Sequence, residues 1–158
     1  MPSRNHSLIR YAWAAPASVL GLALGLFACA LGAQAEVVDG TLEVGGGRFG
    51  GFVSRLPRFL QFGAITLGHV IVGVDRGELN RSRAHERVHV GQYERWGILF
   101  FPLYLGPSLR LLLRGRQPYW ENHFERDARR VAAAAARPGS QRPSLYPRPD
   151  QSRWAGGP

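Results

Sequence analysis

The sequence predicts an α+β fold in which an apolar N-terminal anchor helix precedes a small β-sheet or hairpin region, a helical half and a disordered C-terminal tail. Three observations lead to this fold class. No charged residue lies between Arg10 and Glu36, glycine-punctuated segments rich in β-branched residues follow, and two polar helix starts come after them. The 158-residue chain is therefore expected to divide into residues 1–35, 36–136 and 137–158.

The first segment contains the apolar run APASVLGLALGLFACALGA. A helix of about 19 residues just crosses the hydrocarbon core of a bilayer. The flanking charges change sign across the run: Arg4 and Arg10 precede it, and Glu36, Asp39 and Glu43 follow it. The positive-inside rule then predicts a single-pass helix with the following domain on the exported side, periplasmic or extracellular. The A-Q-A pattern at 33–35 also suits signal-peptidase cleavage, which would give a secreted protein, but the length of the run favours an uncleaved signal anchor over a signal peptide or a buried core helix.

The net charge of +9 comes entirely from arginine, because the chain has no lysine. The arginines are scattered along the whole sequence, so we interpret them as compositional bias and expect no nucleic-acid partner. Cys29 is the only cysteine, which excludes an intramolecular disulfide and a cysteine-based zinc cluster.

The segment from Val37 to about Val74 is expected to form strands. TLEVGGG and AITLGHVIVGV are rich in β-branched residues, and RLPRF separates them. DRGELNRSR then indicates a turn that leads into a helix capped by Asn80 or Ser82 and ending near Trp96.

Residues 97–113, GILFFPLYLGPSLRLLL, are apolar but interrupted by Pro102 and Pro107. This stretch is too short and too broken for a second span, so it is expected to be a buried helix pair or a segment that touches the membrane surface. A second polar helix is predicted in ENHFERDARRVAAAAA, and the Pro, Arg, Ser and Gly-rich residues 137–158 are predicted to be disordered.

The helix before Trp96 carries the motif H-E-x-x-H at His85, Glu86 and His89. Histidines four residues apart project from one helix face, and both imidazoles can reach one Zn²⁺. Glu86 is displaced around the helix, where a carboxylate can act as general base toward a zinc-activated water. The alternative is a solvated helix that carries two imidazoles, but Val88, Val90, Tyr93 and Trp96 indicate a helix that is substantially buried.

At these three residues the sequence resembles the H-E-x-x-H zinc metallopeptidases, the zincins, and more loosely over residues 65–130, where a strand precedes the helix and another helix follows. No third histidine follows at the metzincin spacing, so the gluzincin branch, in which a glutamate of a later helix is the third ligand, fits better. The chain is also similar to small uncharacterised bacterial membrane proteins in two segments, HERVHVGQYERWG and YWENHFERDA.

A catalytic zinc takes three protein ligands and keeps one open position. The downstream candidates are Glu121, His123, Glu125 and Asp127. The resemblance favours Glu125, because Ala128 would let the two helices approach. The alternative is that Glu125 bonds back to the start of its own helix, since Asn122 and Glu125 have a capping-box spacing.

Other polar residues near the motif have more than one possible role. Tyr119 is a candidate catalytic donor to the developing oxyanion, or a core residue. Asn122 or Asp127 could orient a zinc-bound histidine, although Asp127 could instead pair with Arg130. Gln92 is expected near the site, and His69 is expected to be a core histidine within a strand.

Two functions follow from these expectations. The first is a membrane-anchored zinc-dependent hydrolase, most simply a metallopeptidase, whose partners are a peptide or protein substrate and, through the N-terminal helix, membrane lipid. The strand before the motif helix would bind the substrate by edge pairing. The second is a non-enzymatic membrane protein whose zinc site is structural or vestigial. The sequence leaves the oligomeric state open.

Overall fold

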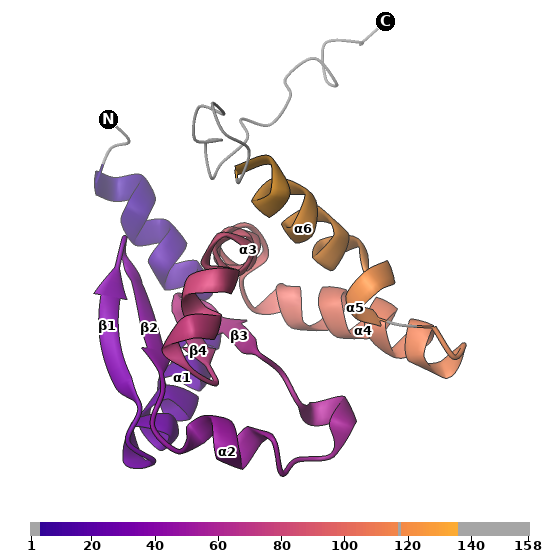
Figure 1. Cartoon of the computed structure of the whole chain (residues 1–158). Helices are drawn as coiled ribbons and strands as arrows, with labels where there is room; N and C mark the ends of the chain where they lie inside the picture. The colour runs from indigo at the N-terminus through magenta and orange to yellow at the C-terminus, as the bar shows by residue number, and fades with distance from the viewer. Residues whose placement is uncertain (1–3, 117, 136–158) are drawn as a thin grey trace, which may run out of the picture.

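The computed structural model describes residues 4–116 and 118–135, and it has an α+β fold built on one small sheet (Figure 1). The predicted disordered tail, 137–158, lies outside the described residues. In chain order the elements are α1 (Arg4–Ala30), β1 (Gln34–Val38), β2 (Thr41–Gly45), α2 (Phe49–Val53), η1 (Arg58–Leu60), β3 (Ala64–Leu67), β4 (Val70–Gly73), α3 (Arg76–Trp96), η2 (Gly97–Leu99), α4 (Phe100–Leu113), α5 (Pro118–Glu121) and α6 (His123–Ala135).

The sheet has four strands in the order β1-β2-β4-β3, with β2 and β4 parallel and the two outer pairs antiparallel. Asp39 and Gly40 join β1 to β2 with positive φ angles of 47° and 80°, as a two-residue type I′ turn requires. The segment AITLGHVIVGV is a hairpin, because Gly68 (φ 63°) and His69 form a turn between β3 and β4. His69 is therefore buried in a turn and not within a strand.

The strand directly before α3 is β4, which lies in the middle of the sheet between β2 and β3. Its backbone groups are already paired on both sides, so the prediction that this strand offers a free edge to a peptide is wrong. The free edge nearest the motif helix belongs to β3, the strand before it.

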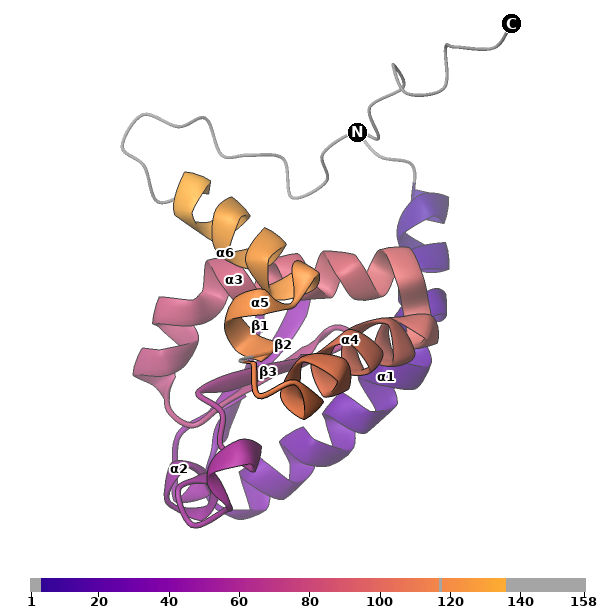
Figure 2. The same ribbon diagram turned by 90° about the vertical axis from the view of Figure 1, so that its right-hand side faces the viewer.

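The two faces of the sheet are covered by different helices, α1 on one side and α3 on the other (Figures 1 and 2). Alternate residues of the central strands serve the two faces: Val70 and Val72 pack in the cluster that includes Ala28 of α1, whereas Ile71 packs against Leu79 and Val90 of α3. This alternation is the expected consequence of the two-residue period of a strand.

The helix α1 packs along the sheet with its small residues. Ala28 is fully buried against the sheet, and glycines at 21 and 25 bring the helix close to β3, β4 and β2. Nearer the start of α1, Ala14 and Ala17 are fully buried against Tyr93 of α3 and Phe100 of α4. The large apolar residues of α1 point outward and are exposed. By length and composition, Ile9–Ala30 is apolar enough to be a membrane span or a signal sequence, as predicted.

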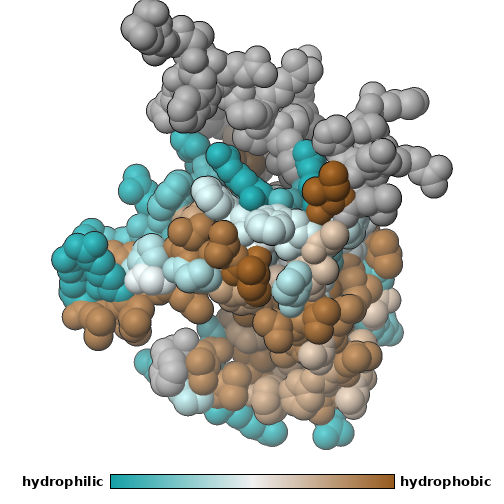
Figure 3. Space-filling model, turned by 180° about the vertical axis from the view of Figure 1, so that it is seen from behind, coloured by the Kyte–Doolittle hydropathy of each residue, from teal (hydrophilic) through white to brown (hydrophobic). Residues whose placement is uncertain are grey.

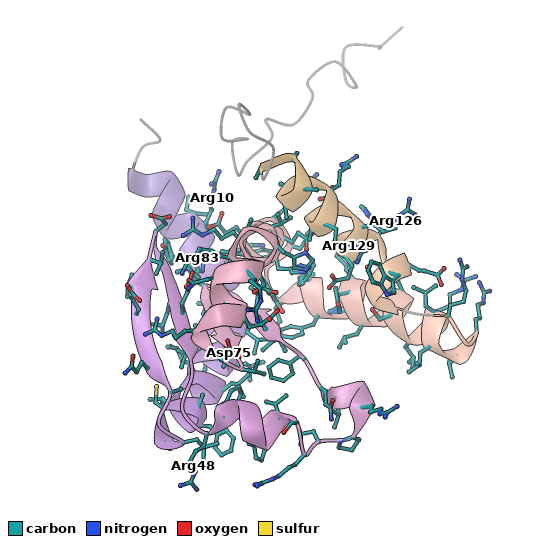
Figure 4. All side chains as sticks on the ribbon, in the orientation of Figure 1. Arg10, Arg48, Asp75, Arg83, Arg126 and Arg129 are labelled. Carbon is teal, nitrogen blue, oxygen red and sulfur yellow. The ribbon has the colours of Figure 1, made fainter. Side chains whose placement is uncertain are left out.

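The motif helix α3 begins earlier than predicted, at Arg76. The cap is Asp75, whose Oδ1 accepts a hydrogen bond from the Glu78 backbone N–H at 2.7 Å, and not Asn80 or Ser82. Asp75 lies at the lower end of α3 in Figure 4. The helix ends at Trp96, as predicted, where Gly97 takes a φ angle of 55°.

One buried ion pair fixes how α3 sits on the sheet. Arg83 donates from Nε and Nη2 to the two carboxylate oxygens of Glu43 on β2, both at 2.8 Å. Glu43 is only 1% exposed, so this bidentate contact supplies the partner that its buried charge requires. The pair holds the helix in one rotational setting, with its histidines turned away from the sheet.

Residues 97–113 form neither a buried helix pair nor two broken pieces. They make one turn of 3-10 helix and then a single helix, α4, that contains Pro107 and has Pro102 in its first turn, where a missing N–H costs little. Among the described residues of α4 only Phe100 is fully buried, and five of its leucines are exposed. The prediction also missed α2, which lies in a glycine-rich segment assigned to strands.

Replacing Gly21 with alanine tests the packing of α1. An added Cβ would lie 2.7 Å from both the Leu67 carbonyl oxygen and the Val70 Cβ, so the backbone must move. We expect the free energy of unfolding to fall by about 1–3 kcal/mol, although alanine is the better helix former. The measurement is denaturant unfolding in mild detergent, followed by circular dichroism.

Gly106→Ala in α4 is the matched control, because nothing lies within 4 Å of the added Cβ there. It should be neutral or slightly stabilising. A Gly21→Ala protein as stable as this control would show that α1 does not pack on the sheet.

Candidate metal centre

Two sides of the helix α3 contact other parts of the fold: one side packs on the sheet, and a neighbouring side contacts α6. Leu79, Arg83, Glu86 and Val90 face the sheet, as their contacts with Ile71, Glu43 and Thr66 show. His85 and His89 project from a neighbouring face toward α6, which lies across α3 in Figure 2. Residues four positions apart lie one turn above each other on a helix, so both imidazoles meet the same neighbour.

The helix α6 approaches α3 closely enough to add a carboxylate to the two imidazoles. Ala128, one turn beyond Glu125, is fully buried, as expected of a small residue at a close helix contact. Asn122 begins α6 by accepting a hydrogen bond from the Phe124 N–H at 2.9 Å. Its amide also donates to the Tyr104 carbonyl oxygen and to Ser108 Oγ on α4, which fixes the start of α6 against that helix.

Three side chains converge at one point: His85, His89 and Glu125. The two Nε2 atoms are 3.1 Å apart. Glu125 places Oε2 at 3.2 Å from His85 Nε2 and Oε1 at 3.4 Å from His89 Nε2. His89 and Glu125 are buried and His85 is half-buried, so the cluster lies at the edge of the interior.

These spacings fit a metal ion. Ligand atoms at about 2.0–2.1 Å from a tetrahedral Zn²⁺ are about 3.3–3.4 Å apart. The two imidazole nitrogens, 3.1 Å apart, lie near that value, and each has a different oxygen of the Glu125 carboxylate at 3.2 or 3.4 Å. Taken with one ligand atom from each residue, the group lies within 4.8 Å. Two imidazoles and one carboxylate are also a donor set that zinc accepts, with a fourth position left open.

Gln92 determines which nitrogen of His89 faces the cluster. Its Nε2 donates to the Phe124 carbonyl oxygen at 3.3 Å, so its Oε1 is the atom 2.8 Å from His89 Nδ1 and must accept the proton there. Neutral His89 then presents the lone pair of Nε2 to the cluster. That lone pair faces carboxylate oxygens, so only a proton or a cation at the centre relieves the repulsion.

Glu125 is held in place as an anion. Tyr104 on α4 donates its hydroxyl to Oε1 at 2.7 Å. Burial alone would raise the pKa of the Glu125 carboxyl, but His85, His89 and Tyr104 outweigh it and hold that pKa well below its usual range. The other oxygen, Oε2, is buried and lies 3.2 Å from His85 Nε2 and 4.0 Å from the Arg129 guanidinium.

His89 responds to the same carboxylate in the opposite sense. Burial lowers the pKa of its imidazole, yet the hydrogen bond and charge of Glu125 more than offset this and raise it. A positive charge is therefore stabilised at the point where the three side chains meet.

Glu86 is buried at the boundary between the two faces of α3. Its Oε2 accepts a hydrogen bond from the Thr66 hydroxyl of β3 at 2.7 Å, with the Glu86 carbonyl oxygen 3.3 Å from the same hydroxyl. Glu86 does not join the converging group, and its role as a base stays a prediction. Thr66 fixes the carboxylate and connects it to an edge of the sheet.

The other candidate ligands lie elsewhere. Glu121 pairs with Arg116, and Asp127 pairs with Arg130 on the surface of α6. His123 is exposed and stacks on Phe124. Glu125 does not fold back onto its own helix start, because its carboxylate faces the histidines and Tyr104.

Sequence reasoning missed Tyr104 and Thr66. A hydroxyl in the apolar run ILFFPLYL was the available signal for Tyr104, because a tyrosine in such a run needs a polar partner. Thr66 gave no signal beyond its place in a strand. The backbone of Tyr119 lies in α5, but its side chain lies outside the described residues, so its role as an oxyanion donor stays a prediction.

Comparison with protein-family models, with curated proteins and with solved structures finds no match to this chain. Any functional conclusion therefore depends on the geometry of the cluster.

Removing the carboxylate of Glu125 tests the cluster directly. Glu125→Ala should lose bound zinc, because two imidazoles alone leave the ion short of a protein ligand. Elemental analysis of the purified full chain, alongside its circular dichroism spectrum, is the measurement. Asp127→Ala, two residues away in the same helix, should keep about one zinc per chain.

Replacing Gln92 tests how the orientation of His89 affects metal binding, because Gln92 contacts the histidine and would not contact the ion. Gln92→Leu removes the acceptor of the His89 Nδ1 proton, and we expect zinc affinity to fall about 10–100-fold. Competition with a chromophoric chelator measures the change. Wild-type affinity in this variant would contradict the orienting role of Gln92.

Proposed function

We propose that the chain is a zinc-dependent hydrolase associated with a membrane, most simply a metallopeptidase of the H-E-x-x-H, gluzincin-like kind. The observation that carries the proposal is the convergence of His85, His89 and Glu125, with the motif glutamate buried next to them. A structural site needs only the ligands. A carboxylate at Glu86 supports a hydrolytic role, because its position suits a general base.

The chemistry divides between the ion and the chain. Zn²⁺ held by this group would activate water for attack and polarise a substrate carbonyl. Glu86 takes a proton as water adds to the carbonyl carbon and returns it to the amine as the C–N bond breaks. Thr66 keeps the Glu86 carboxylate oriented, and Tyr104 keeps Glu125 oriented.

The sheet suggests how an extended substrate would approach. Thr66 belongs to β3, which is an edge strand, so the residue that holds the base also lies on an edge able to pair with another strand. A peptide added to β3 would gain backbone hydrogen bonds beside the metal cluster. This supports a peptide over a small molecule as substrate.

The location of the enzyme follows from α1. If α1 crosses the membrane in a state not packed on the sheet, the arginines before it and the acidic residues after it place the domain on the exported side. An exported hydrolase of this kind would act on peptides or proteins of the cell envelope. That topology stays a prediction.

Glu86→Gln separates the enzyme from the alternative. The amide keeps the size and the Thr66 contact of the glutamate but cannot take a proton, so we expect peptide turnover to fall at least about 100-fold. Zinc content should stay near one per chain. The measurement is cleavage of a mixed peptide library by mass spectrometry, with the two proteins at equal zinc occupancy.

Cleavage of equal rate in both proteins would remove Glu86 from the mechanism. Zinc in both proteins without any cleavage would instead support the non-enzymatic alternative, in which the ion stabilises the contact between α3 and α6.

A further inference from the structure

We infer that the folded chain lies on a membrane with α1 in the plane of the interface, not across the bilayer, and that α4 lies beside it on the same lipid surface. The surface concerned, called here the outer apolar face, consists of Val19, Leu22 and Leu26 of α1 and Leu105, Leu109 and Leu112 of α4. The inference is independent of the metal centre.

The first argument comes from the path of the chain along α1. After α1 ends, β1 and β2 form a hairpin that returns beside the helix, and the Tyr11 hydroxyl donates to the Gly40 carbonyl oxygen at 2.9 Å. The helix from Tyr11 to Ala30 is about 28 Å long, nearly the thickness of the hydrocarbon core. A crossing α1 would therefore carry the hairpin through the core with it.

Lipid would not accept that hairpin. β1 is an edge strand and most of its residues are exposed, including Glu36, while Asp39 in the turn is 71% exposed on its side chain. Open sheet edges do not occur in contact with hydrocarbon, because their backbone groups have no partners there. The packed form of α1 is compatible only with a position in the interface.

The second argument is the arrangement of side chains around α1. A helix on the surface of a water-soluble domain turns large apolar residues inward and polar residues outward. Here Gly21 and Gly25 face the sheet, whereas Val19, Leu22 and Leu26 are 62%, 45% and 71% exposed. Figure 3 shows the resulting hydrophobic surface on the side of α1 away from the sheet.

The helix α4 extends this surface. Leu105, Leu109 and Leu112 follow a helical spacing and are all more than half exposed, while the neighbouring side of α4 carries Tyr104 and Ser108 toward α6. Trp13 of α1 lies against Gly97 at the junction and is 49% exposed, which suits the headgroup level of a membrane. In Figure 3 hydrophobic residues also line the lower side of the arm that α4 forms at the left, whose tip is hydrophilic.

The charge pattern favours anionic lipid as the occupant over a second copy of the chain. No acidic residue lies between Glu94 and Glu121, and the exposed Arg110 and Arg114 stand at the end of α4. Two such helices in contact would bring like charges together, whereas anionic headgroups would complement them.

Vesicle flotation tests the surface. The full chain, diluted from detergent, should float with vesicles made of equal parts phosphatidylcholine and phosphatidylglycerol. Leu105→Gln, Leu109→Gln and Leu112→Gln combined should lower its partition at least about tenfold. The control variant combines Arg126→Gln and Arg130→Gln on α6, which are both exposed; Figure 4 shows Arg126 pointing outward. It removes two positive charges and should leave flotation unchanged. Thermal melting must show that both variants fold.

Cysteine labelling tests the orientation of α1. In a Cys29→Ser background, Ser7→Cys and Val37→Cys are treated separately with a membrane-impermeant maleimide in sealed vesicles of known orientation. An α1 in the interface places both cysteines on one side, so both label from that side and neither from the other. Labelling from opposite sides would overturn the inference in favour of a crossing helix. Equal flotation of wild type and the leucine variant, or dimers that the leucine variant dissociates, would overturn the role of α4.

Discussion

The rotational setting of α3 is the constraint on which the rest of the structure depends. The helix is packed between the sheet and α6, and the Glu43–Arg83 pair fixes which side faces the sheet. A turn of the helix by one residue would move His85 and His89 away from Glu125 and bring Glu86 out of reach of Thr66. A buried charge pair contributes more to this specificity than to net stability, because the desolvation of its charges offsets much of its attraction.

The metal cluster and the membrane surface share one element, α4. Its inner side supports the site, through Tyr104 on Glu125 and through Ser108 and the Tyr104 carbonyl oxygen on Asn122. Its outer side carries the exposed leucines. The proposed third ligand, Glu125, is therefore held by a helix that also has an apolar, exposed side. A change in the position of α4 would move Glu125 directly, because Tyr104 donates to its carboxylate.

The sequence allowed the main helices and the metal group to be predicted because their signals are local. The four-residue spacing of His85 and His89 and the small residue after Glu125 were enough to predict that these three side chains converge, and their role as metal ligands stays a prediction. The cap at Asp75 could have been predicted from the sequence, because Asp75 and Glu78 have the spacing of a capping box. The parallel pairing of β2 with β4 could not be foreseen, because it joins strands separated by α2, η1 and β3. The apolar composition of residues 97–113 predicts burial, because most apolar side chains in folded proteins are buried. The exposed leucines of α4 are an exception that composition alone does not indicate.

The small-residue side of α1 has a consequence for how the chain is made. This helix is synthesised before the sheet, and β4, against which much of it packs, follows only after both β2 and β3. During that interval both sides of α1 lack their final partners, and exposed apolar helices of nascent chains are prone to aggregate. Early delivery of α1 to a lipid surface would cover its large residues and leave the alanine and glycine side open, so that the sheet assembles on a helix already in place.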